Sequence, residues 1–376
     1  MRIGIVCYPT FGGSGVVATE LGLALAARDC DIHFISYAQP VRLDLSLPNV
    51  HFHEVIVTDY PLFDYSPYEL VLTSKLVSVA RHEKLDLLHV HYAIPHASAA
   101  YMAKQILKSH GINLPIVCTL HGTDITLLGR DASFEPVITF AINNSDAVTA
   151  VSESLKNDTY RYFGVNREIL VIPNFINMSR YRNLSCQDLR ERFAGNGERL
   201  LMHVSNFRKV KRVEDVVKVF AQVREKIAAK LILIGDGPER YNVEQMCRSM
   251  GVCGDIHFLG KTKNVERFLG CGDLFLLPSE TESFGLAALE AMAAGLPVIS
   301  TNTGGLPEVN KHAVSGYLSK VGDIDDMAAN ALKILADDET LLRFKKQARE
   351  QAEKFDLPNI LPKYIELYKQ LVLPLV

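Results

Sequence analysis

The sequence lacks three features that would assign a chain to a class at once: a strong net charge, a cysteine pattern and a long apolar run. Its formal net charge of −3 over 376 residues attracts it neither to nucleic acid nor to an anionic membrane, so an anion site has to be local. The seven cysteines include no Cys-x-x-Cys pair, which predicts neither a disulfide framework nor a zinc site and favours a reducing cytoplasm. No stretch approaches the roughly 20 apolar residues of a membrane helix.

The length of the chain and a repeated pattern predict two α/β domains. At 376 residues the chain is long for one hydrophobic core and sufficient for two. Residues 3–8 form an apolar run too short for a signal peptide, and they predict a buried strand, followed by a glycine-rich turn and a helix over 16–27. The second half repeats this pattern, with a strand over 199–205 and a helix over 213–226. We therefore expect two doubly wound domains.

These two domains are expected to span residues 1–171 and 172–355. The stretch 169–177 is interpreted as the linker, because a Pro-Asn pair leaves an apolar run there. Residues 356–376 form a C-terminal segment, in which an amphipathic pattern over 362–373 predicts a last helix.

Two glutamates eight residues apart flank the start of a predicted helix in the second half. The run 283–294 is rich in Ala, Leu and Met, so we expect a helix with Ser283 as its N-cap and Glu290 about two turns in. The exposed N–H groups of such a helix start suit an anion such as a phosphate. Glu290 is the only charge in this apolar run and needs a partner, which ligand hydroxyls would supply. The alternative is that Glu282 is an ordinary first-turn acid and Glu290 a solvated residue.

The glycine-rich turn of the first half matches part of a dinucleotide-binding pattern. Gly13-Ser-Gly15-Val-Val-Ala fits Gly-x-Gly-x-x-Ala, which makes a nicotinamide enzyme a rival interpretation. However, the next predicted strand ends in Ser36 and Tyr37, where an acid should hold the adenosine ribose. A tight turn without a ligand is the other alternative.

Polar side chains end two successive predicted strands of the first half, at the edge where open α/β sheets bind ligands. They are His89, His91, Tyr92 and His96 in the first case, and His121, Thr123 and Asp124 in the second. Three histidines suggest a metal, but His89 and His91 share one strand face, and no carboxylate or thiol lies nearby in the sequence. We therefore favour structural histidines there, and His121 fits a core position as well as a site.

A cluster of cations precedes the helix predicted over 213–226. It consists of Arg208, Lys209, Lys211 and Arg212. Such a charge run is usually a solvated face. The positive end of the helix dipole disfavours cations at a helix start unless a bound anion compensates their charge. A pyrophosphate is such an anion. Bidentate Arg contacts and the point charge of Lys would together stabilise a departing diphosphate.

As a set, these motifs resemble those of retaining glycosyltransferases of family 4, of the two-Rossmann-domain (GT-B) type that includes glycogen and sucrose synthases. The motifs are Gly-Gly-Ser-Gly15, His-x-His-Tyr92, Leu-His-Gly-Thr-Asp124, Arg208 with Lys211, and Glu282-Ser-Phe-Gly followed by Glu290. The resemblance covers nearly the whole chain. It implies a GT-B fold of two Rossmann-like domains with a cleft between them, in which the last helix crosses back onto the first domain.

The resemblance implies a donor site for a nucleotide sugar. Glu290 would hold the ribose hydroxyls, and Glu282 would lie beside the sugar. Lys211 and an arginine would hold the diphosphate. The family commonly places that arginine five residues before the lysine, where this sequence has Asn206, so the role passes to Arg208. The other implied donor residues border the phosphates, the sugar or the base, and they are Gly13, Ser14, Ser283, Phe284, Gly285, Leu286, Leu259 and Val265.

The resemblance also implies an acceptor and a reaction. His121 would contact the primary hydroxyl of the donor sugar, and Ser14, Tyr92 and Thr123 would border the acceptor. The stretches around Tyr92 and Lys211 are similar to those of family members that build low-molecular-weight thiols. This implies transfer of N-acetylglucosamine from UDP to the hydroxyl of L-malate with retention, the first step of bacillithiol biosynthesis.

Several points stay open at this stage. Another acceptor, a UDP-N-acetylglucosamine 2-epimerase and a non-catalytic nucleotide-sugar sensor are the alternatives. We expect no metal or other cofactor, because cations and amides would replace it, and Asp323-Ile-Asp325 is predicted to cap a helix. A homo-oligomer is expected. The acceptor carboxylates need cations, and Arg42, Lys75 and Arg130 are candidates that no pattern places.

Overall fold

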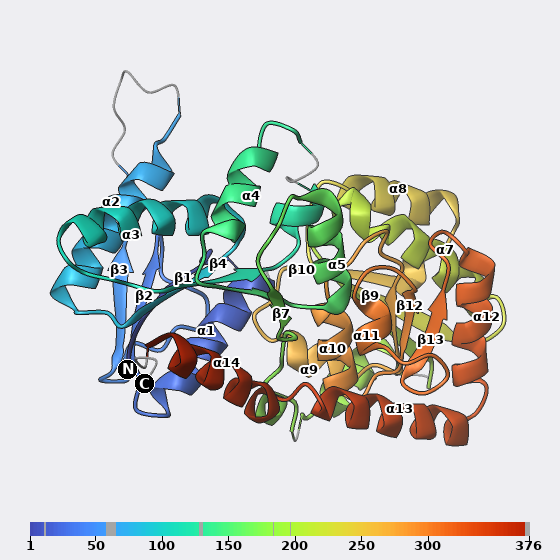
Figure 1. Ribbon diagram of the computed structural model, residues 1–376. Coiled ribbons are helices and arrows are strands. Elements are labelled where there is room, and N and C mark those ends of the chain that lie inside the picture. Colours follow the sequence, from blue (N-terminus) through green and yellow to red (C-terminus); the bar gives the residue numbers. More distant parts are fainter. Residues whose placement is uncertain (11–12, 58–64, 128–130, 183, 196, 373–376) are drawn as a thin grey trace. The chain divides into compact units, whose positions relative to one another are not determined.

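The computed structural model describes residues 1–376 except 11–12, 58–64, 128–130, 183, 196 and 373–376. The chain forms two compact units (Figure 1). One comprises Met1–Phe175 together with the segment that begins at Leu357, and the other comprises Ile176–Asp356. The first unit, the N-terminal domain, is therefore built from two separate pieces of the chain.

The N-terminal domain is a parallel sheet of seven strands in the order β3-β2-β1-β4-β5-β6-β7. The strands are β1 Arg2–Val6, β2 Asp31–Ser36, β3 Val50–Glu54, β4 Leu87–His91, β5 Ile116–Leu120, β6 Ala147–Ala150 and β7 Ile169–Val171. The helices are α1 Gly13–Ala26, α2 Tyr68–His82, α3 Ser98–Ser109, α4 Glu135–Asn143, α5 Glu153–Tyr162 and α14 Leu357–Val372. In Figure 1, α2, α3 and α4 cover one face of this sheet, and α1 and α14 cover the other.

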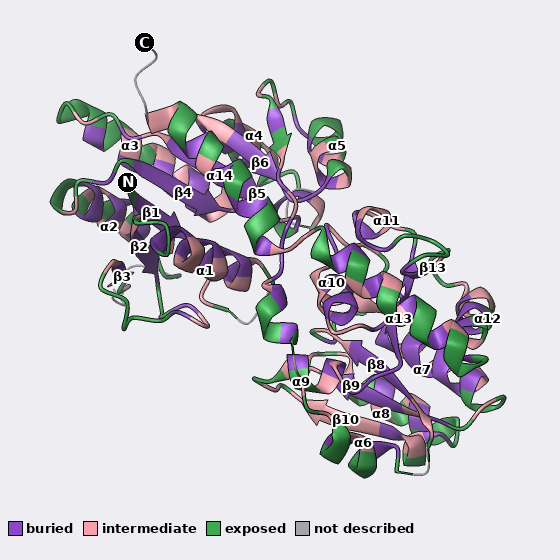
Figure 2. Cartoon of the chain, turned by 90° about the horizontal axis from the view of Figure 1, so that it is seen from below, coloured by how far each residue is buried: buried purple, intermediate pink, exposed green. Residues whose placement is uncertain are grey.

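Coverage on both faces explains why these strands are almost continuously apolar. Every residue of β4 and β5 is buried, and the burial view shows the strands as the interior of the domain (Figure 2). α1 lies so close to the sheet that a Cβ at Gly22 would stand 2.3 Å from the Phe34 ring. α14 contributes the fully buried Tyr364 and Tyr368, and the Tyr368 hydroxyl lies 2.7 Å from His89 Nδ1.

The second unit, the C-terminal domain, is a parallel sheet of six strands in the order β10-β9-β8-β11-β12-β13. The strands are β8 Arg199–Val204, β9 Ala229–Ile234, β10 Ile256–Gly260, β11 Leu274–Leu277, β12 Val298–Thr301 and β13 Gly316–Ser319. The main helices are α6 Gln187–Phe193, α7 Val213–Arg224, α8 Arg240–Ser249, α9 Val265–Leu269, α10 Leu286–Ala293, α11 Leu306–Val309, α12 Ile324–Leu335 and α13 Asp338–Glu353. Apolar side chains of α7, α8 and α12 share one core cluster with those of β8, β9 and β11.

Both sheets have the doubly wound order, which confirms the fold class predicted from the sequence. The apolar run that opens the stretch 169–177 is strand β7, because Ile169–Val171 pairs with β6, and the two units divide after Phe175, inside that stretch. One local prediction was wrong, because a disulfide joins Cys247 and Cys253. The two cysteines are six positions apart, so they do not form a Cys-x-x-Cys motif. The turn after α8 nevertheless brings their Cα atoms to 5.0 Å.

The structure tests two further sequence predictions, the helix cap at Asp323 and the lack of a membrane helix. Asp323 is the N-cap of α12, where its side chain accepts a hydrogen bond of 3.1 Å from the Asp326 N–H, as predicted for that Asp-x-Asp. Within the described residues, no helix has both the length and the apolar character needed to cross a bilayer.

Candidate active site

Each sheet has one point at which the strand order reverses, and the loops that leave the two strands there define the expected ligand edge. In the N-terminal domain this switch point lies between β1 and β4, and in the C-terminal domain between β8 and β11. Most of the residues singled out in the sequence lie in the loops or at the helix starts that follow these four strands and β5, and two more lie at the end of β10 and the start of α9.

At the switch point of the C-terminal domain, an ion pair joins the loop after β8 to the loop after β11. Lys211 Nζ donates a hydrogen bond of 2.5 Å to Glu282 Oε1, which also accepts one of 2.9 Å from the Ser279 hydroxyl. The backbone reinforces this junction, since the Glu280 N–H donates to the Val210 carbonyl at 2.8 Å. Two residues predicted separately, 71 positions apart in the sequence, therefore form one unit.

A pair of glycines after β12 holds the Glu282 backbone in place. Gly304 has φ +57°, and a Cβ there would lie 1.9 Å from the Glu282 carbonyl oxygen. The Gly305 N–H donates to the same oxygen at 2.8 Å. A side chain at either position would push the Glu282 loop away, because the contact is with backbone atoms. The strand-then-glycine pattern of 298–305 is the signal that could have revealed this support in the sequence.

A buried histidine lies beneath the ion pair. His203 Nδ1 lies 2.8 Å from the Leu276 carbonyl, which can only accept, so Nδ1 carries the proton and Nε2 accepts from the Ser205 hydroxyl at 2.8 Å. Burial lowers the pKa of His203 to about 4. This imidazole is therefore neutral at pH 7 and does not oppose the charge of Lys211. No sequence pattern indicates this position beneath the ion pair, because His203 lies inside a predicted strand.

The helix between the two glutamates starts later than predicted. α10 begins at Leu286, and its N-cap is Gly285 with φ +99°, so Ser283 is not the cap. The left-handed turn explains the shift, because it requires a glycine immediately before the helix. The unpaired N–H groups of the first turn then begin at Leu286, and Glu290, half-buried, stands one turn into the helix instead of two. Ser283 and Phe284 lie in the bend before it.

The remaining donor candidates lie at the carboxyl edge of the same sheet. Asn206 and Arg208 are exposed in the loop after β8, whose anchor is the buried Phe207. This loop rests on Gly237, where a Cβ would stand 2.8 Å from Phe207 backbone atoms. Arg212 is used within the fold, since its Nε donates to Asp215 Oδ2 at 2.5 Å. The base candidates, both half-buried, end β10 and begin α9: Leu259 and Val265.

At the switch point of the N-terminal domain, a hydrogen bond joins the start of α1 to the end of β4. The Tyr92 hydroxyl donates to Ser14 Oγ at 2.7 Å, across 78 positions of the sequence. Burial raises the pKa of Tyr92 to about 12, so the phenol stays protonated. Gly15 allows the close approach, because a Cβ there would lie 2.5 Å from the Tyr8 carbonyl oxygen. Gly13 is exposed as the first residue of α1.

Asp124 is a positioning residue for the loops after β4 and β5. Its Oδ2 accepts from the Ala93 N–H at 2.8 Å and its Oδ1 from the Gly122 N–H at 3.1 Å. Burial raises the pKa of Asp124 to about 6, against the lowering effect of these N–H groups. Its side chain therefore faces the backbone. The neighbouring Thr123 is exposed at the start of the next turn.

The histidines of these strands lie against one another, with His89, His91 and His96 buried and His121 half-buried. His121 Nε2 lies 2.8 Å from His91 Nδ1, and the His89 and His91 ring centroids are 4.4 Å apart. Burial lowers the pKa of His89 and of His121 to about 3 and that of His96 to about 4. Among the described residues, none of these histidines belongs to a group of side chains close enough together to share a metal ion.

The three cations considered for the acceptor carboxylates lie in different surroundings. Arg42 Nη1 pairs with Glu20 Oε1 at 3.3 Å. Lys75 lies on α2, half-buried. Arg130 lies outside the described residues.

Comparisons with known proteins agree with this arrangement. A family model for group 1 glycosyl transferases matches residues 187–351, and one for glycosyltransferase family 4 matches residues 11–180. N-acetyl-alpha-D-glucosaminyl L-malate synthase of Bacillus anthracis is 48% identical over 98% of this chain and 96% of its own length. Sulfoquinovosyl transferase SQD2 of Arabidopsis thaliana is 28% identical over 79% of this chain and 59% of its own.

Solved structures share the fold at low sequence identity. HepE of Anabaena, in complex with UDP-glucose, has a TM-score of 0.83 at 22% identity, over 98% of this chain and all of that one. Sucrose-phosphate synthase of Thermosynechococcus elongatus has a TM-score of 0.80 at 21% identity, over 98% of each chain. Two doubly wound domains with these likenesses define a GT-B glycosyltransferase. The matches over nearly the whole sequence then show that the chain belongs to the group 1 and family 4 glycosyltransferases, as the motifs predicted.

Proposed function

We propose that this glycosyltransferase moves N-acetylglucosamine from UDP to the hydroxyl of L-malate with retention at the anomeric carbon, as the first step of bacillithiol biosynthesis. The observation that carries the proposal is the 48% identity, over 98% of the chain, to a relative named N-acetyl-alpha-D-glucosaminyl L-malate synthase. The Lys211–Glu282 pair at the switch point supports it, because a lysine there is placed to meet a diphosphate.

In the proposed reaction, the bond between the anomeric carbon and the diphosphate oxygen breaks while a bond to the malate hydroxyl oxygen forms. The malate proton passes to the departing diphosphate oxygen on the same face of the sugar, and UDP leaves. Retention by double displacement would need a carboxylate nucleophile near the anomeric carbon. Glu282 is engaged by Lys211 and Ser279, and we assign it to the sugar hydroxyls, so we infer the same-face route.

Electrostatic stabilisation of the leaving diphosphate is the main task of the protein in this mechanism. We assign it to Lys211, Arg208 and the N–H groups that begin at Leu286. We place the ribose hydroxyls at Glu290 and the base at Leu259 and Val265. With this cationic and amide environment the reaction requires no metal, so activity persists in EDTA.

The N-terminal domain supplies polar groups of fixed protonation. His121 is neutral, because burial lowers its pKa to about 3, and it can exchange a hydrogen bond with a sugar hydroxyl without adding charge. Tyr92 and Ser14 are already joined by a hydrogen bond and would border malate together with Thr123. We also expect a homo-oligomer.

The test measures UDP release from UDP-N-acetylglucosamine with and without L-malate, and analyses the product by mass spectrometry and by the coupling of its anomeric proton. We expect release only with malate and an α-linked product. Succinate is the matched control, because it keeps both carboxylates and lacks the accepting hydroxyl. Conversion of the donor alone would indicate an epimerase, turnover only with other acceptors a different transferase, and binding without turnover a sensor. Each of these outcomes contradicts the proposal.

A further inference from the structure

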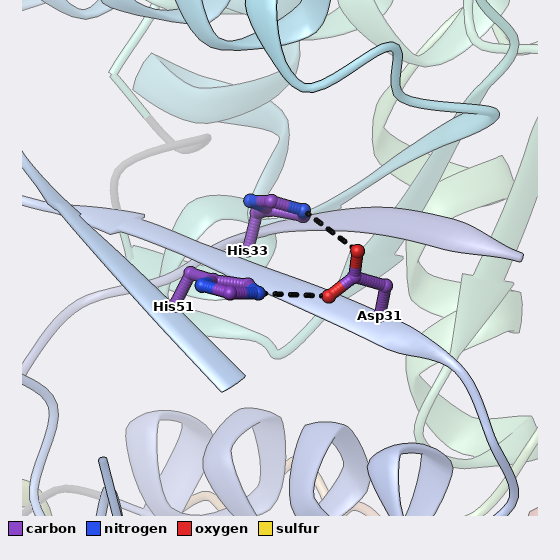
Figure 3. A group of neighbouring side chains, drawn as sticks. All are labelled: Asp31, His33 and His51. Carbon is purple, nitrogen blue, oxygen red and sulfur yellow. Dashed lines mark hydrogen bonds and ion pairs between the residues drawn. The ribbon is translucent and has the colours of Figure 1, made fainter. Parts of the chain in front are cut away.

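Three histidines and an aspartate lie together on one face of β2 and β3, the last two strands at one edge of the N-terminal sheet. They are His53 and the three residues drawn in Figure 3, Asp31, His33 and His51. The strands pair in parallel with His33 opposite His51, and because side chains alternate between faces, the four share one side. The intervening Phe34 faces α1 on the other side. Neither the fold nor the proposed reaction uses this cluster.

The distances within the cluster suit a shared cation. The two carboxylate oxygens of Asp31 each face a different imidazole, with Oδ1 2.8 Å from His51 Nε2 and Oδ2 3.7 Å from His33 Nε2. The His33 and His51 rings are stacked with centroids 4.7 Å apart. One ligand atom from each of the three residues lies within 4.8 Å of the others. Donor atoms about 2.1 Å from one tetrahedral ion lie about 3.4 Å apart, so small adjustments of these side chains would bring the three atoms onto one ion.

One atom of the cluster is buried and has no hydrogen-bond partner among the residues that the structure describes. His33 is 2% exposed, and its Nε2 makes no hydrogen bond of normal length. Its other nitrogen, Nδ1, lies 2.9 Å from His53 Nε2. If Nδ1 donates its proton to His53, the Nε2 lone pair points toward Asp31 with nothing to accept from. A buried nitrogen lone pair next to a carboxylate is the arrangement of a metal ligand.

We propose that Asp31, His33 and His51 bind a divalent transition-metal ion, for which Zn²⁺ is the best fit. Two imidazoles and one carboxylate form a donor set that zinc accepts, and magnesium or calcium would prefer oxygen alone. The Asp31 and His51 side chains are 36% and 41% exposed, so water completes the coordination. Arg2 Nε stands 3.9 Å from Asp31 Oδ2, and an ion there would displace this long pair.

His53 orients His33 and does not bind the ion. With the ion on His33 Nε2, the proton of His33 lies on Nδ1, which would donate it to His53 Nε2 at 2.9 Å, and such a bond through the second nitrogen orients a metal-bound imidazole. A second possible group, His33 with His53 and Glu83, would need the His33 nitrogen that this bond already occupies.

The ion would have a structural role. Asp31 and His51 lie near the beginnings of their strands, whereas substrates bind beyond the carboxyl ends. β3 is an edge strand and pairs on one side only, with β2. An ion held by both strands would fasten this edge, and it would stabilise the folded state because the unfolded chain has no such site.

The test uses untagged protein, and it measures Zn²⁺ affinity by competition with a chromophoric chelator and the Tm with and without Zn²⁺. We expect one ion per chain, a raised Tm, and a visible absorption band when Co²⁺ is used instead. Asp31→Asn and His51→Ala should weaken binding by at least tenfold, and His53→Gln by roughly tenfold to a hundredfold. His110→Ala, at an exposed histidine outside the cluster, is the matched control and should bind as the unchanged protein does.

Three outcomes overturn the proposal. They are the absence of one-to-one binding, unchanged affinity in both Asp31→Asn and His51→Ala, and weakening by Glu83→Gln in place of Asp31→Asn. The two partly exposed positions are chosen so that the variants fold, and the metal-free Tm of each variant verifies this. Glycosyl transfer by His51→Ala should equal that of the unchanged protein, which separates this site from the active site.

Discussion

The Lys211 ammonium has two anionic partners available in the proposed reaction. Without substrate it lies 2.5 Å from Glu282 Oε1, with both side chains largely shielded from water. A bound diphosphate carries more negative charge than one carboxylate and offers several oxygens, so it would draw the ammonium away. The neutral His203 below leaves the lysine free to turn either way. Glu282 would then be released toward the hydroxyls of the sugar.

We therefore expect Lys211→Ala to lower kcat/KM for UDP-N-acetylglucosamine by about 10²–10³-fold, the usual cost of removing one preorganised charge-stabilising group. Steady-state kinetics at saturating malate measures this. Lys209→Ala removes an exposed cation two residues away and should change kcat/KM by less than about twofold. Equal kinetics for the Lys211 variant and the unchanged protein would show that the diphosphate binds elsewhere.

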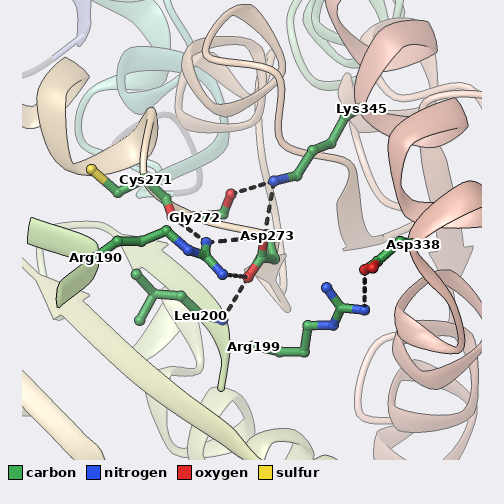
Figure 4. Close-up of polar contacts among 8 residues, drawn as sticks. All are labelled: Arg190, Arg199, Leu200, Cys271, Gly272, Asp273, Asp338 and Lys345. Carbon is green, nitrogen blue, oxygen red and sulfur yellow. Dashed lines mark hydrogen bonds and ion pairs between the residues drawn. The ribbon is translucent and has the colours of Figure 1, made fainter. Parts of the chain in front are cut away.

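At the scale of elements, one buried carboxylate fastens several parts of the C-terminal domain. Asp273 accepts hydrogen bonds from Arg190 of α6 at 3.0 and 3.1 Å, from Lys345 of α13 at 2.9 Å, and from the Leu200 N–H of β8 at 2.9 Å (Figure 4). Burial alone would raise the pKa of Asp273, but Lys345 and Arg190 hold it below its ordinary value. A second pair in the same figure, Arg199 with Asp338, lies at the surface.

We expect Asp273→Ala to lower the free energy of unfolding by about 3–5 kcal/mol, because it leaves two cations and an N–H without their partner. Asp338→Ala removes an acid whose side chain is 82% exposed and should cost less than about 1 kcal/mol. Urea denaturation at pH 7 compares the two variants. Similar losses for both would mean that Asp273 is as well solvated as Asp338.

The sequence predicted elements where a local pattern decides the structure. The strand over 199–205 and the helix over 213–226 match β8 and α7 to within two residues, since apolar periodicity depends on neighbouring positions. β3 was not predicted, because its histidines interrupt the apolar pattern. The start of α10 was wrong because a left-handed glycine, and not a serine cap, sets it.

Site residues were predictable one at a time, but their partners were not. Lys211, Glu282, Tyr92 and Ser14 each follow a predicted strand, where ligand contacts are expected. Nothing local indicates that Lys211 meets Glu282 or that Tyr92 meets Ser14, because strand order brings these loops together. The family resemblance supplied roles, and the structure supplied the pairs.

At the scale of the whole molecule, the buried histidines make stability depend on pH. Burial lowers the pKa of several imidazoles from an ordinary value near 6.5: to about 3 for His89 and His121, and to about 4 for His96 and His203. Their folded-state pKa is depressed, so the unfolded chain binds more protons below pH 6.5. The stabilisation they give is complete above that pH and is lost as the pH falls toward 4.

We therefore expect the free energy of unfolding to fall as the pH drops from 7 to 5, with each such histidine contributing at most about 1.4 kcal/mol per pH unit, a slope that is approached only below pH 6.5. Urea titrations across this range provide the measurement. His96→Asn keeps a donor for the His91 carbonyl and should reduce the slope, whereas His110→Asn, at an exposed position, should not. A stability that rises as the pH falls would contradict this account.

The position of α14 in the sequence also affects when the N-terminal domain can finish folding during translation. Residues 176–356, which number 181 (356 − 175), separate this helix from the rest of its domain. At roughly 5–20 residues per second, a ribosome needs about ten to forty seconds to pass through them. During that interval the nascent chain has no Tyr368 to meet His89. The domain whose translation starts first is therefore completed last, after its neighbour has left the exit tunnel.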